Sequence, residues 1–121
     1  MKKFFIVAAA MMALYTTNVN AVELDTNGRD PKYVETIMQR SKKVTDALNI
    51  SGTEKGEQVL NIVANRYFKL NDIYAERDSL KAVAKTMTGE EKKRKMEYAE
   101  MLKDQKLYKS HFGFIADLSV Y

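Results

Sequence analysis

The side chains best suited to hold a ligand gather in one stretch of the chain, from Tyr67 to Asp78. Positions 67, 71, 74 and 78 are spaced so that they form one stripe along a helix. With a neighbouring arginine, the candidate ligand-binding residues are Tyr67, Asn71, Tyr74, Arg77 and Asp78. Tyrosine rings beside an amide, a carboxylate and a guanidinium can stack on a sugar and hydrogen-bond to it. The alternative is that the tyrosines lie at the edge of the core and that Arg77 and Asp78 pair between helices.

Residues for the common catalytic and metal-binding chemistries are scarce. His111 is the single histidine and cysteine is absent, which excludes two-histidine and thiolate metal sites and covalent haem attachment. No serine lies in a nucleophile elbow, and the glycines are too scattered to form a phosphate-binding loop. Asp72 and Asp78 lie on different faces of a helix, which argues against a pair of glycosidase carboxylates. The residues favour a binding protein over an enzyme without deciding the point, and we expect no cofactor or metal.

A long helix must position the candidate stripe. Apolar residues recur at every third or fourth position between Thr53 and Met87, and the stretch contains no proline. This spacing predicts one helix roughly 50 Å long, at about 1.5 Å per residue. Thr53 is the expected N-cap. Asn71 and Asp72 have poor helix propensity, but the apolar spacing continues through them in phase.

Two further helices are predicted, one on either side of the long helix. Asp30 followed by Pro31 is typical of a helix start, and the apolar spacing continues to Leu48. The sequence TGEE at 88–91 is a capping box, which should close the long helix and open a third. The basic run at 92–95 is better explained as a solvated, ion-paired turn than as a site for an anionic partner, and we expect no nucleic acid. The predicted fold is all-α, an antiparallel bundle of about three helices with one long central helix.

The N-terminal residues have the pattern of an export signal. Lys2 and Lys3 precede a run of twelve apolar residues at 4–15, and small residues precede a cleavage point after Ala21. This run is shorter than the about 20 residues that a bilayer-spanning helix needs. Loss of the two lysines lowers the net charge from +4 to +2. We therefore expect a cleaved signal peptide at 1–21, a flexible leader at 22–29 and a helical domain at 30–121, in a periplasmic or secreted protein without a membrane span.

Several short motifs are shared with a known group of proteins: RY at 66–67, LNDI at 70–73, RD at 77–78 and HFGF at 111–114. On these motifs the chain, from about residue 31 to 121, resembles an exported bacterial family known as domain of unknown function 3826. The resemblance implies an all-helical protein of Gram-negative bacteria that use polysaccharides, with no established activity. It also implies further helices after residue 121. The apolar C-terminal sequence FGFIADLSVY agrees with a truncated member of that family.

Two kinds of function are compatible with these observations. The first is an accessory binding protein linked to polysaccharide utilisation, whose partner is a glycan or another envelope protein held at the Tyr67–Asp78 stripe. The second is a chaperone-like or envelope-stress protein that binds unfolded clients through the apolar faces of its helices. The sequence does not decide between them, and it leaves the oligomeric state open.

Overall fold

The computed structural model describes residues 21–121, which form three helices and no strand. Helix α2 spans Pro31–Ala47, α3 spans Glu54–Ala84 and α4 spans Gly89–Leu118. The predicted all-α fold with one long central helix is confirmed. The predicted signal peptide lies, except for Ala21, outside the described residues.

The helix starts follow from their capping residues. The Asp30 carboxylate accepts a hydrogen bond from the Tyr33 backbone N–H at 3.2 Å, and Thr53 Oγ1 accepts one from the Gly56 N–H at 2.9 Å. Each side chain satisfies a donor that has no partner within the helix. The capping box at 88–91 correctly predicts where α4 begins, but the Thr88 side chain makes no capping hydrogen bond. That part of the prediction is wrong.

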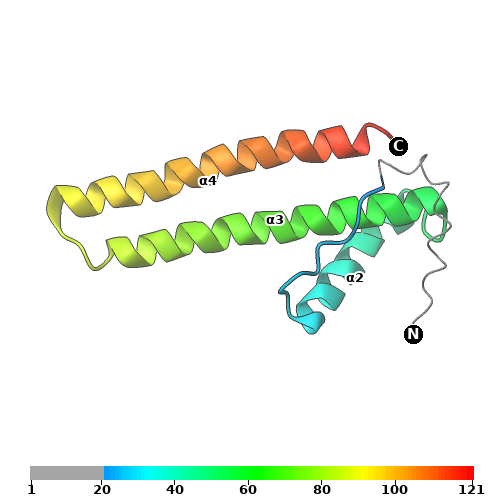
Figure 1. Ribbon diagram of the computed structural model, residues 1–121, viewed down its shortest axis with the longest axis horizontal. Coiled ribbons are helices and arrows are strands. Elements are labelled where there is room, and N and C mark those ends of the chain that lie inside the picture. Colours follow the sequence, from blue (N-terminus) through cyan, green and yellow to red (C-terminus); the bar gives the residue numbers. More distant parts are fainter. Residues whose placement is uncertain (1–20) are drawn as a thin grey trace.

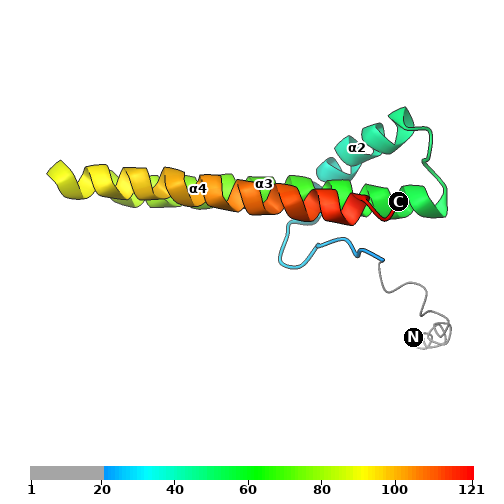
Figure 2. The same ribbon diagram turned by 90° about the horizontal axis from the view of Figure 1, so that it is seen from above.

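Helix α3 is the central element of the fold. Helix α4 runs antiparallel along it, whereas α2 packs against its N-terminal half (Figures 1 and 2). Helices α2 and α4 do not pack against each other. No helix among residues 21–121 is both long enough and apolar enough to cross a membrane.

The core lies where α2 crosses α3. Ile37 of α2 packs there with Ala64 and Phe68 of α3, and all three are buried. The rings of Tyr33 and Phe68 lie 5.5 Å apart between centroids. Ser41 is also buried, and its hydroxyl donates to the Ile37 carbonyl at 2.8 Å, so this polar group is satisfied within its own helix. The small α2–α3 core therefore fixes the position of α2.

Candidate functional site

The first half of the predicted stripe lies against α2. Tyr67 is half-buried and packs against the core cluster of Ile37, Ala64 and Phe68. Asn71 Nδ2 donates a hydrogen bond of 2.6 Å to the Tyr33 hydroxyl. These two side chains thus take part in packing between helices.

The second half of the stripe forms a separate group farther along α3. The Arg77 guanidinium carbon lies 5.0 Å from the centroid of the Tyr74 ring. Arg77 Nε donates to Asp78 Oδ1 at 3.0 Å. Tyr74 and Asp78 are exposed. The structure therefore divides the five predicted residues into two groups, and a ligand-binding role for them stays a prediction.

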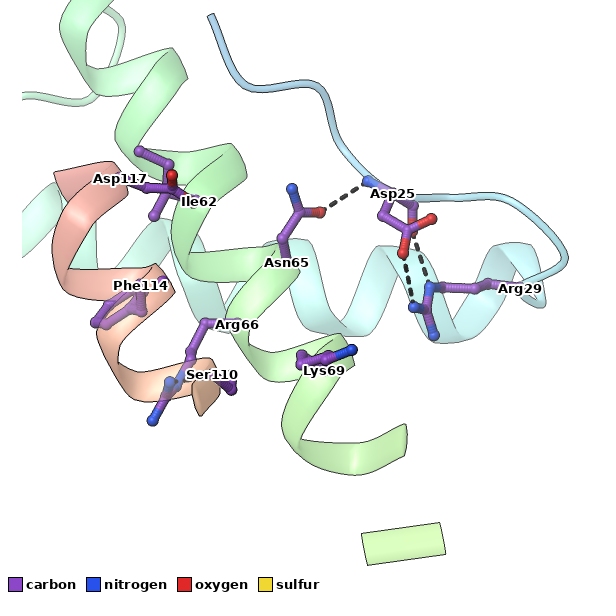
Figure 3. A pocket seen from close by; sticks show the side chains of 10 residues that line it. Asp25, Arg29, Ile62, Asn65, Arg66, Lys69, Ser110, Phe114 and Asp117 are labelled. Carbon is purple, nitrogen blue, oxygen red and sulfur yellow. Dashed lines mark hydrogen bonds and ion pairs between the residues drawn. The ribbon is translucent and has the colours of Figure 1, made fainter. Parts of the chain in front are cut away.

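A groove lies beside the predicted stripe, with a volume of about 310 Å³ (Figure 3). None of the five predicted residues lines it. Its floor is α3, one wall is the segment at 22–29, and the other wall is the C-terminal part of α4. The lining residues are Asp25, Arg29, Ile62, Asn65, Arg66, Lys69, Ser110, Gly113, Phe114 and Asp117.

The sequence contained a signal for this groove. The α3 residues lie at 62, 65, 66 and 69, and the α4 residues at 110, 113, 114 and 117, so both sets follow the i, i+3, i+4, i+7 spacing of one helix face. Each stripe is readable from the sequence. That the two stripes face each other depends on how α4 is rotated and aligned on α3, which the spacing does not specify.

The wall at 22–29, which we call the N-terminal strap, is attached to α3 through its backbone. Asn65 Oδ1 accepts a hydrogen bond from the Asp25 N–H at 2.7 Å, and Asn65 Nδ2 donates to the Glu23 carbonyl at 2.8 Å. Two side chains earlier in α3 bind the backbone of Val22. Asn61 Nδ2 donates a hydrogen bond to its carbonyl at 3.0 Å, and Gln58 Oε1 accepts one from its N–H at 2.7 Å. The segment predicted as a flexible leader thus lies along α3, held by three side-chain amides.

Arg29 fastens the other end of the strap. Its Nη1 and Nη2 donate to the two carboxylate oxygens of Asp72 at 3.1 and 3.0 Å, and Nη2 also donates to Asp25 at 2.9 Å. The guanidinium carbon lies 4.4 Å from the centroid of the Phe68 ring. The hydrogen bonds to Asp72, which have the largest effect, and to Asp25 raise the pKa of Arg29 above its ordinary value. Burial acts in the opposite direction and lowers this pKa. Two carboxylates therefore offset the positive charge of Arg29.

Two other cations of the groove have no such partner. Arg66 Nη1 donates to Ser110 Oγ at 3.2 Å, and its guanidinium carbon lies 5.1 Å from the Phe114 ring centroid. Lys69 is exposed on the next turn of α3. Within residues 21–121, neither Arg66 nor Lys69 forms an ion pair with a carboxylate. The groove can therefore offer positive charge to a ligand.

The described residues contain no cluster of side chains suited to hold a metal ion, because no three or more of their histidine or acidic side chains form such a group. His111 is exposed and outside the groove lining, with its ring 5.9 Å from that of Phe112. Asp72 is paired with Arg29, whereas Asp78 is paired with Arg77. The arrangement is suited to binding through hydrogen bonds, one aromatic ring and charge.

Comparison with known proteins places the chain in a family. A search of curated proteins finds no match to it. A family model described as "Protein of unknown function (DUF3826)" matches residues 34–121, which confirms the resemblance read from the sequence. Because the match covers most of the chain, this protein belongs to the DUF3826 family.

Proposed function

We propose that this protein is an exported accessory binding protein that holds a short saccharide in the groove between the N-terminal strap, α3 and α4. The observation that supports this function is the groove itself. It combines hydrogen-bonding side chains, two unpaired cations and the ring of Phe114 within one concave surface. Saccharides need several hydrogen-bonding partners placed around a ring, together with some apolar contact.

The size of the groove agrees with a short ligand. Its volume of about 310 Å³ lies near the lower end of the range of roughly 300–1,000 Å³ that is typical of small-molecule sites. The walls come from segments far apart in the sequence, so the site exists only when the strap and α4 are both in place. A link to polysaccharide utilisation and a periplasmic or secreted location are part of this proposal. Mass spectrometry of the N-terminus of the exported protein tests the location, with cleavage after Ala21 as the expected result.

Gly113 provides a direct test of binding in the groove. It lines the groove, and a Cβ built on it meets no atom within 4 Å. Because the Cβ meets no neighbour, we expect a Gly113→Leu side chain to extend into the groove. Wild-type protein should bind at least one saccharide of a broad glycan array, and Gly113→Leu should weaken that binding by about tenfold or more, because a filled site excludes the ligand.

Two control variants make this test specific. Gly113→Ala fills much less of the groove and should retain binding. Ala116→Leu adds the same side chain at an exposed position of α4 that does not line the groove. Each protein is first compared by circular dichroism and thermal unfolding. The proposal fails if no saccharide binds, or if Gly113→Leu binds as tightly as the wild type.

A second function is favoured by a different surface. Helix α4 has a stripe of exposed apolar side chains at spacings of three, four or seven residues: Tyr98, Met101, Tyr108, Phe112 and Ile115. The rings of Tyr108 and Phe112 meet edge to face at 4.8 Å between centroids, and Tyr108 is 69% exposed. Exposed apolar patches of this kind are typical of surfaces that bind other polypeptides. This stripe supports a chaperone-like role as the alternative proposal.

The alternative has its own test. The purified protein is mixed with an enzyme that aggregates on heating, and light scattering is followed. Tyr108→Ser and Phe112→Ser should abolish any suppression of aggregation, because they remove apolar contact area, yet both lie outside the groove lining and should leave saccharide binding unchanged. Absence of any suppression by the wild type would rule out this role.

A further inference from the structure

We propose that the groove selects saccharides that carry oxyanions, the carboxylates of uronic acids or sulfate esters, and that Arg66 and Lys69 each bind such a group. This inference rests on the proposed function, because it names the ligand class of the same groove. It is carried by the distribution of charge among the lining residues.

The positive charges of the groove are not equivalent. Arg29 is 13% exposed and is bound by Asp25 and Asp72, so it serves to hold the strap. Arg66 and Lys69 are three residues apart on the floor and form no ion pair within the described part of the chain. Two cations are thus left for a ligand, and anionic groups on the ligand would pair with them.

Arg66 is held in a fixed position for this role. The Phe114 ring lies beneath its guanidinium, and Ser110 accepts one hydrogen bond from Nη1 at 3.2 Å. A guanidinium carries five N–H donors in a planar fork, so donors remain for a ligand, and that fork matches the two oxygens of a carboxylate or sulfate. Because Arg66 is already ordered by Phe114 and Ser110, binding costs less side-chain entropy than it would for a free arginine.

The two cations flank the floor of the groove. In Figure 3 the Arg66 side chain points toward α4, whereas Lys69 points toward the strap. A ligand lying across α3 would therefore meet one cation at each wall.

Asp117, the remaining acid of the groove, lies away from these cations. Helix α4 runs antiparallel to α3 and Ser110 contacts Arg66, so Asp117, seven residues later on α4, lies toward Ile62 rather than toward Lys69. The separation of the negative charge of Asp117 from the two positive charges favours one orientation of a charged sugar in the groove.

Matched ligands test the inference by isothermal titration calorimetry on the full mature chain. The probes are trigalacturonate, its fully methyl-esterified form, a neutral galactose trisaccharide and the sulfated form of that trisaccharide. We expect the uronate, the sulfated sugar or both to bind about tenfold more tightly than their neutral counterparts, as for hydrogen bonds to a charged group. Raising the salt concentration from about 0.05 M to about 0.5 M should weaken binding of the charged probe only, because salt screens exposed charges.

Variants of the two cations assign the contact. Lys69→Gln should weaken binding of the charged probe by about threefold, as for an exposed ion pair. Arg66→Gln should weaken it by about tenfold, as for a charge-assisted hydrogen bond. Both variants should weaken binding of the uncharged probe less than binding of the charged probe, because only hydrogen bonds to neutral groups are lost there. Lys55→Gln, at an exposed position of α3 outside the groove lining, is the matched control and should bind as the wild type does.

The outcomes separate this inference from the proposed function. Equal affinity for charged and neutral probes, with both lost in Gly113→Leu, would support saccharide binding and overturn the selection of oxyanions. Full affinity for the charged probe in both Lys69→Gln and Arg66→Gln would overturn the assignment of these residues. Because Lys69 is exposed, its variant tests the assignment even if Arg66→Gln fails to fold. Binding of no saccharide at all would overturn both proposals.

Discussion

Arg29 and Asp72 are joined by two hydrogen bonds of 3.1 and 3.0 Å, although they lie 43 residues apart in the chain. Arg29 belongs to the N-terminal strap and Asp72 to the middle of α3. The same guanidinium covers the ring of Phe68, a buried core residue, at 4.4 Å. This one side chain therefore links the wall of the groove to the core between α2 and α3.

Removal of the Asp72 charge should loosen the strap. Asp72→Asn keeps the shape of the side chain but removes the ion pair, so we expect the free energy of unfolding to fall by about 1 kcal/mol, a moderate value because Asp72 is 54% exposed. Urea denaturation measures this loss, and hydrogen exchange of the Asp25 amide should become faster. Lys42→Gln breaks an exposed pair with Asp46 within α2 and serves as the control, with an expected change of only a few tenths of a kcal/mol. Equal effects of the two substitutions would contradict a special role for the Arg29–Asp72 pair.

Gly56 should not accept even one additional methyl group. It is buried in the first turn of α3, and a Cβ built on it lies 1.8 Å from the carbonyl oxygen of Ile50. Because that neighbour is backbone, the connector between α2 and α3 would have to move. We expect Gly56→Ala to lower the free energy of unfolding by about 1–3 kcal/mol, despite the better helix propensity of alanine. A denaturation midpoint equal to or above that of the wild type would refute this prediction.

Gly113 should show the opposite behaviour. It lies inside α4, and a Cβ there meets nothing within 4 Å. Alanine reduces the conformational freedom of the unfolded chain and favours the helix, so Gly113→Ala should raise the free energy of unfolding by about 0.5–1 kcal/mol. Thermal and urea unfolding, measured alongside Gly56→Ala, test the contrast between the two glycines. A loss of stability in Gly113→Ala would show that the position has a contact that the structure does not contain.

The packing of α4 on α3 should weaken in acid, because Glu100 then becomes protonated. Its carboxylate accepts hydrogen bonds from Lys81 of α3 and from Lys103. These contacts, with Lys81 having the larger effect, lower its pKa from 4.5 to about 2. A carboxyl whose pKa is lowered by folding stabilises the protein above its unfolded pKa. This contribution should therefore be complete above about pH 4.5 and lost as the pH falls toward 2.

Carbon-detected NMR titration of the Glu100 carboxyl measures this pKa directly. Lys81→Met removes the largest cause of the shift, so the pKa should move back toward its ordinary value. In parallel, the difference in stability between wild type and Glu100→Gln should shrink as the pH is lowered from about 5 to about 2. An unchanged titration curve in Lys81→Met would show that the contact between Lys81 and Glu100 does not lower the pKa of Glu100.

The sequence determined the elements of this protein because their signals are local. Capping residues and proline mark the starts of α2 and α3, and the apolar spacing runs through Asn71 and Asp72 without a break. The predicted helices at 31–48 and 53–87 agree with the observed α2 and α3 to within three residues at each end. The family motifs and the all-α class were also readable, since both depend on short stretches of sequence.

Only the tertiary structure decided where a site can form. The groove needs the α3 stripe around Arg66 to face the α4 stripe around Phe114, and this depends on the rotation and alignment of two helices whose contacting residues lie more than 40 positions apart. It also needs the strap, whose backbone is bound by amide side chains such as Asn65, a contact that leaves no pattern in the strap's own residue types. The stripe from Tyr67 to Asp78 was visible because it lies on one helix, whereas the groove is divided among three segments that only folding brings together.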